Sequence, residues 1–214
     1  IIRHQLSSHK KIIRVLTHTG CIDVTDDHSL LYKDGTRVSP KDLKIGDELL
    51  HKDLDFKYNQ LQENEVEETF SVDEARTFSI FFGEGSSKYY NYKSNLLPSH
   101  SYGCTESYIN KYRRLFYNNK IKFIPNNIFK SSMKVKKAFL QGIYDSIGDT
   151  ELHKGKIIAK KIYQKSMISA MSLYYLCISL GYNVSINTSK DKPNIFIIKY
   201  TKNKFIKNPN AIKN

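Results

Sequence analysis

Residues 12–31, IIRVLTHTGCIDVTDDHSLL, decide how the amino-terminal part of the chain folds. Two short apolar, β-prone runs, 12–16 and 21–24, are separated by a turn signal at Thr19-Gly20. A second turn signal, Asp34-Gly35, follows a third short run and is typical of a hairpin. The pattern predicts that the first part of the chain is mostly β-structure with tight turns.

The quoted stretch contains Thr25-Asp26-Asp27-His28, which can aim a hydroxyl and an imidazole from the end of one strand. Histidine suits proton transfer near neutral pH, although Thr-x-x-His also occurs as a plain turn anchor. The whole run, with VSPKDLKIGDELL at 38–50, resembles the Thr-x-x-His block of inteins, above all those of B-family DNA polymerases. The resemblance implies that His28 protonates the upstream splice-junction peptide bond. It implies that Thr25 helps to hold this bond in a strained geometry.

The same resemblance implies a Cys or Ser at the first intein residue and an Asn, usually preceded by His, at the last. Ile1 is neither Cys nor Ser, and Asn214 follows Lys213. We therefore expect both splice junctions to lie outside this sequence. We also expect that the chain alone does not splice.

The composition favours an intracellular protein that contacts a polyanion. The chain has 34 Lys and Arg against 21 Asp and Glu, a formal net charge of +13. Such an excess favours nucleic acid or an acidic membrane surface, with simple solubility as the plain alternative. The three cysteines, Cys21, Cys104 and Cys177, form no CxxC pair, which argues for a reducing compartment. The sequence contains neither a signal-peptide pattern nor an apolar run of the ~20 residues that span a bilayer, so no membrane-spanning segment is expected. The basic strands described below as DNA contacts make a membrane role unnecessary.

Two helices with matching ends are predicted further along the chain. Ser71 and Glu74 have the spacing of a capping box, and residues 71–83 become apolar before glycine. Residues 135–148 also end in an apolar run and glycine, although either helix alone would pass for a core helix with a glycine cap. Further helices are predicted over 107–117 and 166–180, strands over 89–92 and 156–162, and a hairpin over 183–188 and 194–200.

The stretches TFSIFFGEG at 77–85 and LQGIYDSIG at 140–148 resemble the paired motifs of LAGLIDADG homing endonucleases. Small residues such as Ser79 and Gly142 would let two such helices pack closely. The resemblance implies that each helix ends in an acid that binds Mg²⁺ for DNA cleavage, under two saddles of β-strands.

The two motifs differ at the acid position. The first carries Glu84, which we expect to be both catalytic and the metal ligand, whereas the second carries Ile147, which cannot bind a metal. Asp145 occupies the earlier acid position, which is more often structural, and is a weaker catalytic candidate. Lys122, in KFIPNNI at 122–128, matches a family lysine that assists the active centre, although a solvated lysine would look the same.

Lysines and tyrosines interleave in two predicted strand segments, 88–93 (KYYNYK) and 198–204 (IKYTKNK). Lysines neutralise phosphates and tyrosines donate hydrogen bonds to the DNA backbone, although solvated edge strands share this pattern. The predicted DNA contacts are Lys88, Tyr90, Lys93, Lys199 and Lys202. Double-stranded DNA is therefore the expected partner of a monomeric chain, with segments of the host DNA polymerase joined in cis.

These patterns together predict an α+β fold. A partial all-β Hint-type splicing segment (1–52) is followed by a linker (53–68), a LAGLIDADG-like domain (69–201) and a return segment (202–214). The expected domain has two pseudo-repeats, paired central helices and a β saddle. We expect a partial intein whose endonuclease domain binds DNA but nicks it or leaves it uncut. Two alternatives stay open: an active double-strand endonuclease in which Asp145 or Asp149 substitutes, and an inert relic that does not bind DNA.

Overall fold

The computed structural model describes residues 7–51, 69–84 and 106–203. The first range belongs to one compact unit and the other two ranges to a second. Helices and small antiparallel sheets occur together, so the predicted α+β class is confirmed. The predicted linker 53–68 and nearly all of the predicted return segment 202–214 lie outside the described residues, and the proposed domain boundaries stay a prediction.

The first unit is built from two short hairpins. Strand β1 (Ile12–Thr17) pairs with β2 (Gly20–Thr25), and β3 (Leu30–Leu31) pairs with β4 (Arg37–Val38), ahead of the 3-10 helix η1 (Pro40–Asp42). Gly35 has a φ of +87°, in the left-handed region that favours glycine, and it forms the predicted turn. Ile12, Ile22 and Leu50 are each about half exposed, at 53%, 44% and 52%.

The second unit contains all five described α-helices. These are α1 (Val72–Glu84), α2 (Glu106–Phe116), α3 (Asn126–Lys130), α4 (Met133–Ile147) and α5 (Met167–Ser179). The predicted capping box forms at the start of α1, where the Ser71 amide donates to Glu74 and the Glu74 amide donates to Ser71 Oγ, both at 3.1 Å. None of the described helices combines the length and apolar character that crossing a bilayer requires.

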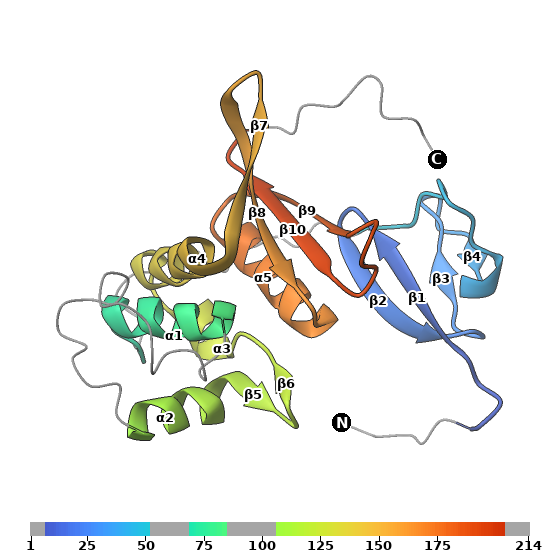
Figure 1. The fold of residues 1–214 in the computed structure, drawn as a ribbon. Coiled ribbons are helices and arrows are strands. Elements are labelled where there is room, and N and C mark those ends of the chain that lie inside the picture. The colour runs from blue at the N-terminus through green and yellow to red at the C-terminus, as the bar shows by residue number, and fades with distance from the viewer. Residues whose placement is uncertain (1–6, 52–68, 85–105, 204–214) are drawn as a thin grey trace. The chain divides into compact units, whose positions relative to one another are not determined.

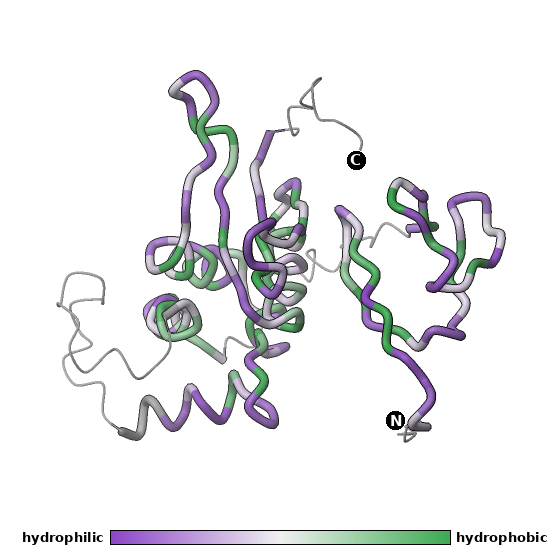
Figure 2. The backbone as a smooth tube through the Cα atoms, turned by 45° about the vertical axis from the view of Figure 1, so that its right-hand side comes forward, coloured by the Kyte–Doolittle hydropathy of each residue, from purple (hydrophilic) through white to green (hydrophobic). Residues whose placement is uncertain are grey.

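A four-stranded antiparallel sheet follows α4 in the second unit (Figure 1). Its strands are β7 (Gly148–His153), β8 (Lys156–Gln164), β9 (Asn183–Thr188) and β10 (Phe196–Thr201), in the order β7-β8-β10-β9. The sequence patterns missed β7, because its residues are mainly polar. They also missed the small hairpin of β5 (Tyr117–Asn118) and β6 (Ile121–Lys122). Figure 2 shows a hydrophilic turn at the tip of β7 and β8.

The sheet has one buried face and one opposite face that is partly exposed. Ile162, Ile198 and Ile186 are paired across β8, β10 and β9, and all three are fully buried beside α5. Residues one position along each strand therefore point to the opposite, outer face. A second cluster of buried aromatic rings joins α1, α2 and α4, with the Phe116 and Phe139 rings stacked at a centroid distance of 5.7 Å. The predicted strand over 89–92, in the stretch that follows the first motif, lies outside the described residues.

Candidate functional site

Helices α1 and α4 pack against each other along small residues. A Cβ atom on Gly142 would lie 1.9 Å from Ser79 Oγ and 2.9 Å from the carbonyl oxygen of Arg76. A Cβ atom on Gly83 would lie 2.2 Å from Ser146 Oγ. These contacts advance by four residues along both helices, so the two helices run in the same direction. Their carboxyl ends therefore lie together.

The two acid positions predicted from the sequence fall at these adjoining ends. Glu84 is the last residue of α1, and Ile147 is the last residue of α4. A Cβ atom on Gly83 would lie 3.3 Å from Ile147 Cγ1. The fold therefore brings the end of the first motif beside the isoleucine of the second.

Lys122, in β6, is held at the same end of α1. Its Nζ donates to the carbonyl oxygen of Phe82 at 2.5 Å and lies 4.3 Å from the centroid of the Phe82 ring. Its own carbonyl oxygen accepts a hydrogen bond from Ser169 Oγ at 2.6 Å, which ties β6 to α5. Burial lowers the pKa of Lys122 to about 8, so this amine can exchange a proton near neutral pH. Lys122 is thus anchored on Phe82, which lies two residues before Glu84 in α1.

Asp145 bridges the helix pair through side-chain donors. One carboxylate oxygen accepts from Arg76 of α1 at 2.9 Å, and the other accepts from Gln141 at 2.5 Å. Both oxygens therefore have partners within the protein. In the ranges 7–51, 69–84 and 106–203, no group of three His, Cys, Asp or Glu residues is arranged to hold a metal ion.

Asp149, the other acid near the second motif, lies on β7. Its Oδ1 accepts from the Thr150 amide at 2.7 Å, and its Oδ2 accepts from the Tyr163 hydroxyl at 3.3 Å. Asp149 is paired with Lys161 in the β7–β8 register, and Lys161 alternates with buried Ile162. Asp149 therefore belongs to the outer face of the sheet.

The outer face carries a small charged cluster formed by Glu151, Lys161 and Lys199. The Glu151 carboxylate lies 2.6 Å from Lys199 Nζ and 3.5 Å from Lys161 Nζ. Burial alone would raise the pKa of Glu151, but the two lysines lower this pKa by a larger amount. The pKa of Glu151 therefore lies below its usual range. Lys161 and Lys199 are direct cross-strand neighbours, and Glu151 reduces the repulsion between them.

The predicted DNA contacts do not all fall on this face. Lys199 lies on it, whereas Lys202 is exposed just after β10, with its Nζ 5.9 Å from the Tyr182 ring centroid. Lys88, Tyr90 and Lys93 lie outside the described residues.

Thr25 and His28 lie on one tight turn at the end of β2. The His28 amide donates to the Thr25 carbonyl oxygen at 3.0 Å, and the Asp26 amide donates to the Lys11 carbonyl oxygen at 2.9 Å. Ser39 Oγ closes the turn from the other side by donating to the Asp26 carbonyl oxygen at 2.8 Å. Thr25 is half-buried and His28 is exposed, so the imidazole is accessible.

Asp27 lies between these two residues and forms an ion pair with Lys10. The Lys10 ammonium and, secondarily, the Thr25 hydroxyl lower the pKa of Asp27 to about 2. The loop before β1 is therefore connected to the turn that carries Thr25 and His28.

Sequence reasoning missed Arg76 and Glu151. Arg76 interrupts the buried side of α1 eight residues before Glu84, and a cation in that position was a readable signal for a carboxylate on a neighbouring helix. Glu151 had no such signal, because its lysine partners come from strands that only the sheet topology brings together.

No protein-family model matches this chain. The chain is similar to a DNA polymerase from Acanthamoeba polyphaga mimivirus, with 35% identity over 254 aligned positions. The alignment covers 100% of this chain but 14% of the polymerase. The chain thus corresponds to a limited segment of that relative.

Proposed function

We propose that this chain is part of an intein inserted in a DNA polymerase, carrying a splicing segment and a LAGLIDADG-type homing endonuclease impaired at one metal site. The observation that carries the endonuclease proposal is the parallel, close packing of α1 and α4 through Gly83 and Gly142. This packing aligns the two sequence motifs, so that their acid positions meet at one end of the pair. Similarity to a small segment of a viral DNA polymerase supports the insertion.

The impairment follows from the residues around the shared helix end. Glu84 can supply a hard carboxylate ligand for Mg²⁺, whereas Ile147 has no atom that binds a cation. The Asp145 carboxylate already accepts hydrogen bonds from Arg76 and Gln141. The Asp149 carboxylate accepts a hydrogen bond from Tyr163 on the outer sheet face. Neither acid therefore replaces Ile147. Each strand cut needs a metal-activated water and a stabilised leaving oxygen, so loss of one ligand disables most of the reaction.

Duplex DNA would lie on the outer face of the sheet, where Lys161 and Lys199 point away from the helices. Phosphate contacts from such lysines need no particular base sequence and fall with added salt. The excess of 34 basic over 21 acidic residues supports this assignment.

In the splicing segment, Thr25 and His28 would act on the upstream junction peptide bond. The Thr25–His28 turn supports this role, because it holds a hydroxyl and an exposed imidazole at one strand end. Imidazole is suited to protonating the leaving amide nitrogen near neutral pH.

The decisive experiment uses a supercoiled plasmid that carries the uninterrupted polymerase insertion site. The chain is incubated with it and Mg²⁺, and nicked and linear products are separated on a gel. We expect binding with nicked circles at most, and no linear DNA. Ile147→Asp should restore the missing ligand and produce linear DNA, whereas Ile147→Asn, which has similar size without a carboxylate, should not.

Each outcome decides between the proposal and its alternatives. Linear DNA from the unaltered chain would show that both strands are cut and would overturn the impairment. Absence of any plasmid binding at low salt would leave only an inert insertion. Binding by Ile147→Asp without linear product would contradict the metal assignment at this position.

A further inference from the structure

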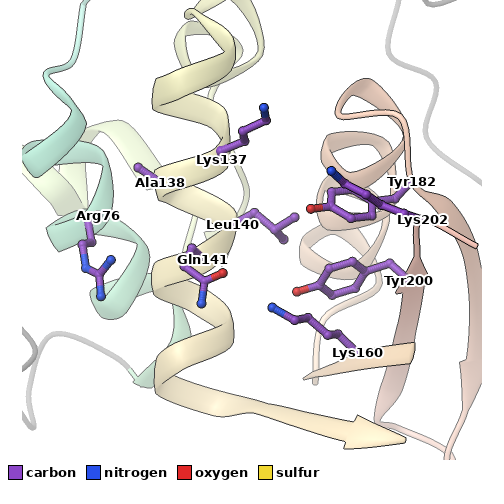
Figure 3. Close-up of a pocket in the computed structure, with 9 residues that line it drawn as sticks. All are labelled: Arg76, Lys137, Ala138, Leu140, Gln141, Lys160, Tyr182, Tyr200 and Lys202. Atoms are coloured by element: carbon purple, nitrogen blue, oxygen red, sulfur yellow. The ribbon is translucent and has the colours of Figure 1, made fainter. Parts of the chain in front are cut away.

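A concave site lies on the helix side of the sheet, opposite the outer face that we assign to duplex DNA. It is a cavity of about 390 Å³ bounded by α1 and α4 and by β8, β10 and the segments beside β10. A volume of this size falls within the ~300–1,000 Å³ typical of small-molecule sites. Figure 3 shows its lining residues, with α4 on one side and the sheet residues on the other.

Four cations line the cavity, and three of them form no ion pair within the residues that the structure describes. Lys137, Lys160 and Lys202 line it, and none of them forms an ion pair with another residue in the part of the chain that the structure describes. Arg76 also lines it, but its guanidinium is paired with Asp145 at 2.9 Å. The charge of Asp145 is thereby balanced by Arg76. Three ammonium groups around one hollow favour a ligand with several negative oxygens.

Neutral donors and rings complete the lining. Figure 3 shows the hydroxyls of Tyr182 and Tyr200 and the ammonium of Lys160 pointing from the sheet side toward α4. The two tyrosine rings meet edge to face at a centroid distance of 5.2 Å, and Tyr200 is only 2% exposed. Leu140 adds an apolar surface. A ligand that combines phosphate oxygens with a flat ring would use both kinds of surface.

We propose that this cavity binds the phosphates of a nucleotide, either a free nucleoside triphosphate or the phosphorylated end of a single strand. The three lysines contact phosphate oxygens, the tyrosine hydroxyls donate hydrogen bonds, and the tyrosine rings with Leu140 contact the base or sugar. The site is separate from the proposed DNA face, because adjacent residues of β8 point to opposite sides of the sheet. Lys160 faces α4, with its Nζ 4.0 Å from the Tyr144 ring centroid, whereas Lys161 faces Glu151.

This alternation gives a matched pair of variants. Lys160→Gln and Lys161→Gln each remove one charge from the same strand, so they change the net charge equally. Binding of dATP, a 5′-phosphorylated oligo(dT) 12-mer and an insertion-site duplex to the whole chain is measured at 150 mM NaCl by calorimetry or anisotropy. We expect Lys160→Gln to weaken binding of the cavity ligand about tenfold and Lys161→Gln to leave it unchanged.

The two anionic probes distinguish the sources of the phosphate. Selective weakening of dATP binding identifies a free nucleotide, and selective weakening of 12-mer binding identifies a strand end. Lys137→Gln, at an exposed position of α4, gives a second test that does not depend on the Lys160–Tyr144 contact. Equal weakening by Lys160→Gln and Lys161→Gln, or no binding of dATP and 12-mer, overturns the proposal. Duplex binding should respond to Lys161→Gln alone, so failure of the proposed endonuclease function is recognised separately.

Discussion

Replacing Gly142 with alanine tests the contact on which the helix pair depends. The added methyl group would meet Ser79 Oγ at 1.9 Å and the Arg76 carbonyl oxygen at 2.9 Å. Ser79 can turn away only by giving up its 2.6 Å hydrogen bond to the Arg76 carbonyl oxygen, and the backbone oxygen can yield only if the helices move apart.

The expected loss of stability combines two destabilising contributions and one stabilising contribution. Overpacking of this kind costs about 1–3 kcal/mol, and losing the hydrogen bond adds about 1 kcal/mol. The higher helix propensity of alanine returns about 1 kcal/mol. Gly142→Ala should therefore lower the free energy of unfolding by about 2 kcal/mol, which corresponds to roughly 4–8 °C in Tm for a chain of this size.

Urea unfolding followed by circular dichroism at 222 nm measures this loss, because all described α-helices lie in the second unit. Gly83→Ala is the matched control. The three atoms nearest its methyl group all belong to the side chains of Ser146 and Ile147. Ser146 Oγ can turn away by giving up its 2.9 Å hydrogen bond to the Ile143 carbonyl oxygen, a cost of about 1 kcal/mol that the higher helix propensity of alanine offsets, so we expect a loss below about 1 kcal/mol. A double-mutant cycle with Ser79→Gly should give a coupling of at least about 1 kcal/mol. If the free energy of unfolding of Gly142→Ala instead rises by the helix-propensity gain of about 1 kcal/mol, α1 and α4 do not pack as closely as described.

Three further predictions concern the surroundings of this helix pair. Ser71→Ala removes the capping box and should lower the free energy of unfolding by about 1 kcal/mol in urea titrations, and an unchanged midpoint would contradict the cap. Arg76→Met and Asp145→Asn should be coupled by about 1 kcal/mol in a thermal-unfolding cycle, because their ion pair is only partly exposed, and additive effects would argue against it. The lowered pKa of Lys122, about 8, means that the unfolded chain binds more protons between pH 8 and 10.5, so stability conferred by this residue rises with pH. Relative to Lys122→Met, the unaltered chain should gain about 3 kcal/mol across that window, and parallel stability curves would refute the burial of Lys122.

Local chemistry could be predicted from the sequence wherever it depends on near neighbours. Residues a few positions apart in the chain determine three such features. These are the capping box at Ser71, the apolar run of α1 and the end of α5 before Gly181. Strand β7 was missed because GDTELH has no apolar alternation, and it is a strand only because β8 offers it a paired edge.

Pairings across the fold could not be predicted in this way. Arg76, one of the two partners of Asp145, comes from α1, and Lys199, one of the two partners of Glu151, comes from β10, both far away in the sequence. The opposite directions of Lys160 and Lys161 follow from strand alternation, but which of them faces the helices depends on where the sheet packs. The predicted interleaving of lysine and tyrosine in the last strand therefore combined residues of two different sites, with Lys199 on the outer face and Tyr200 and Lys202 at the cavity.

The Glu151 carboxylate has a consequence for how the outer face would meet DNA. Before any duplex arrives, Lys161 and Lys199 already have an internal anion between them, so they attract fewer mobile ions from solution. A phosphate that replaces Glu151 would exchange one anion for another and release fewer counterions than two free lysines would. Binding through these residues should thus depend less on salt than the charge of +13 suggests. The Glu151 carboxylate would compete with DNA phosphates for Lys161 and Lys199, so only a phosphate placed well enough to displace it would bind these two lysines.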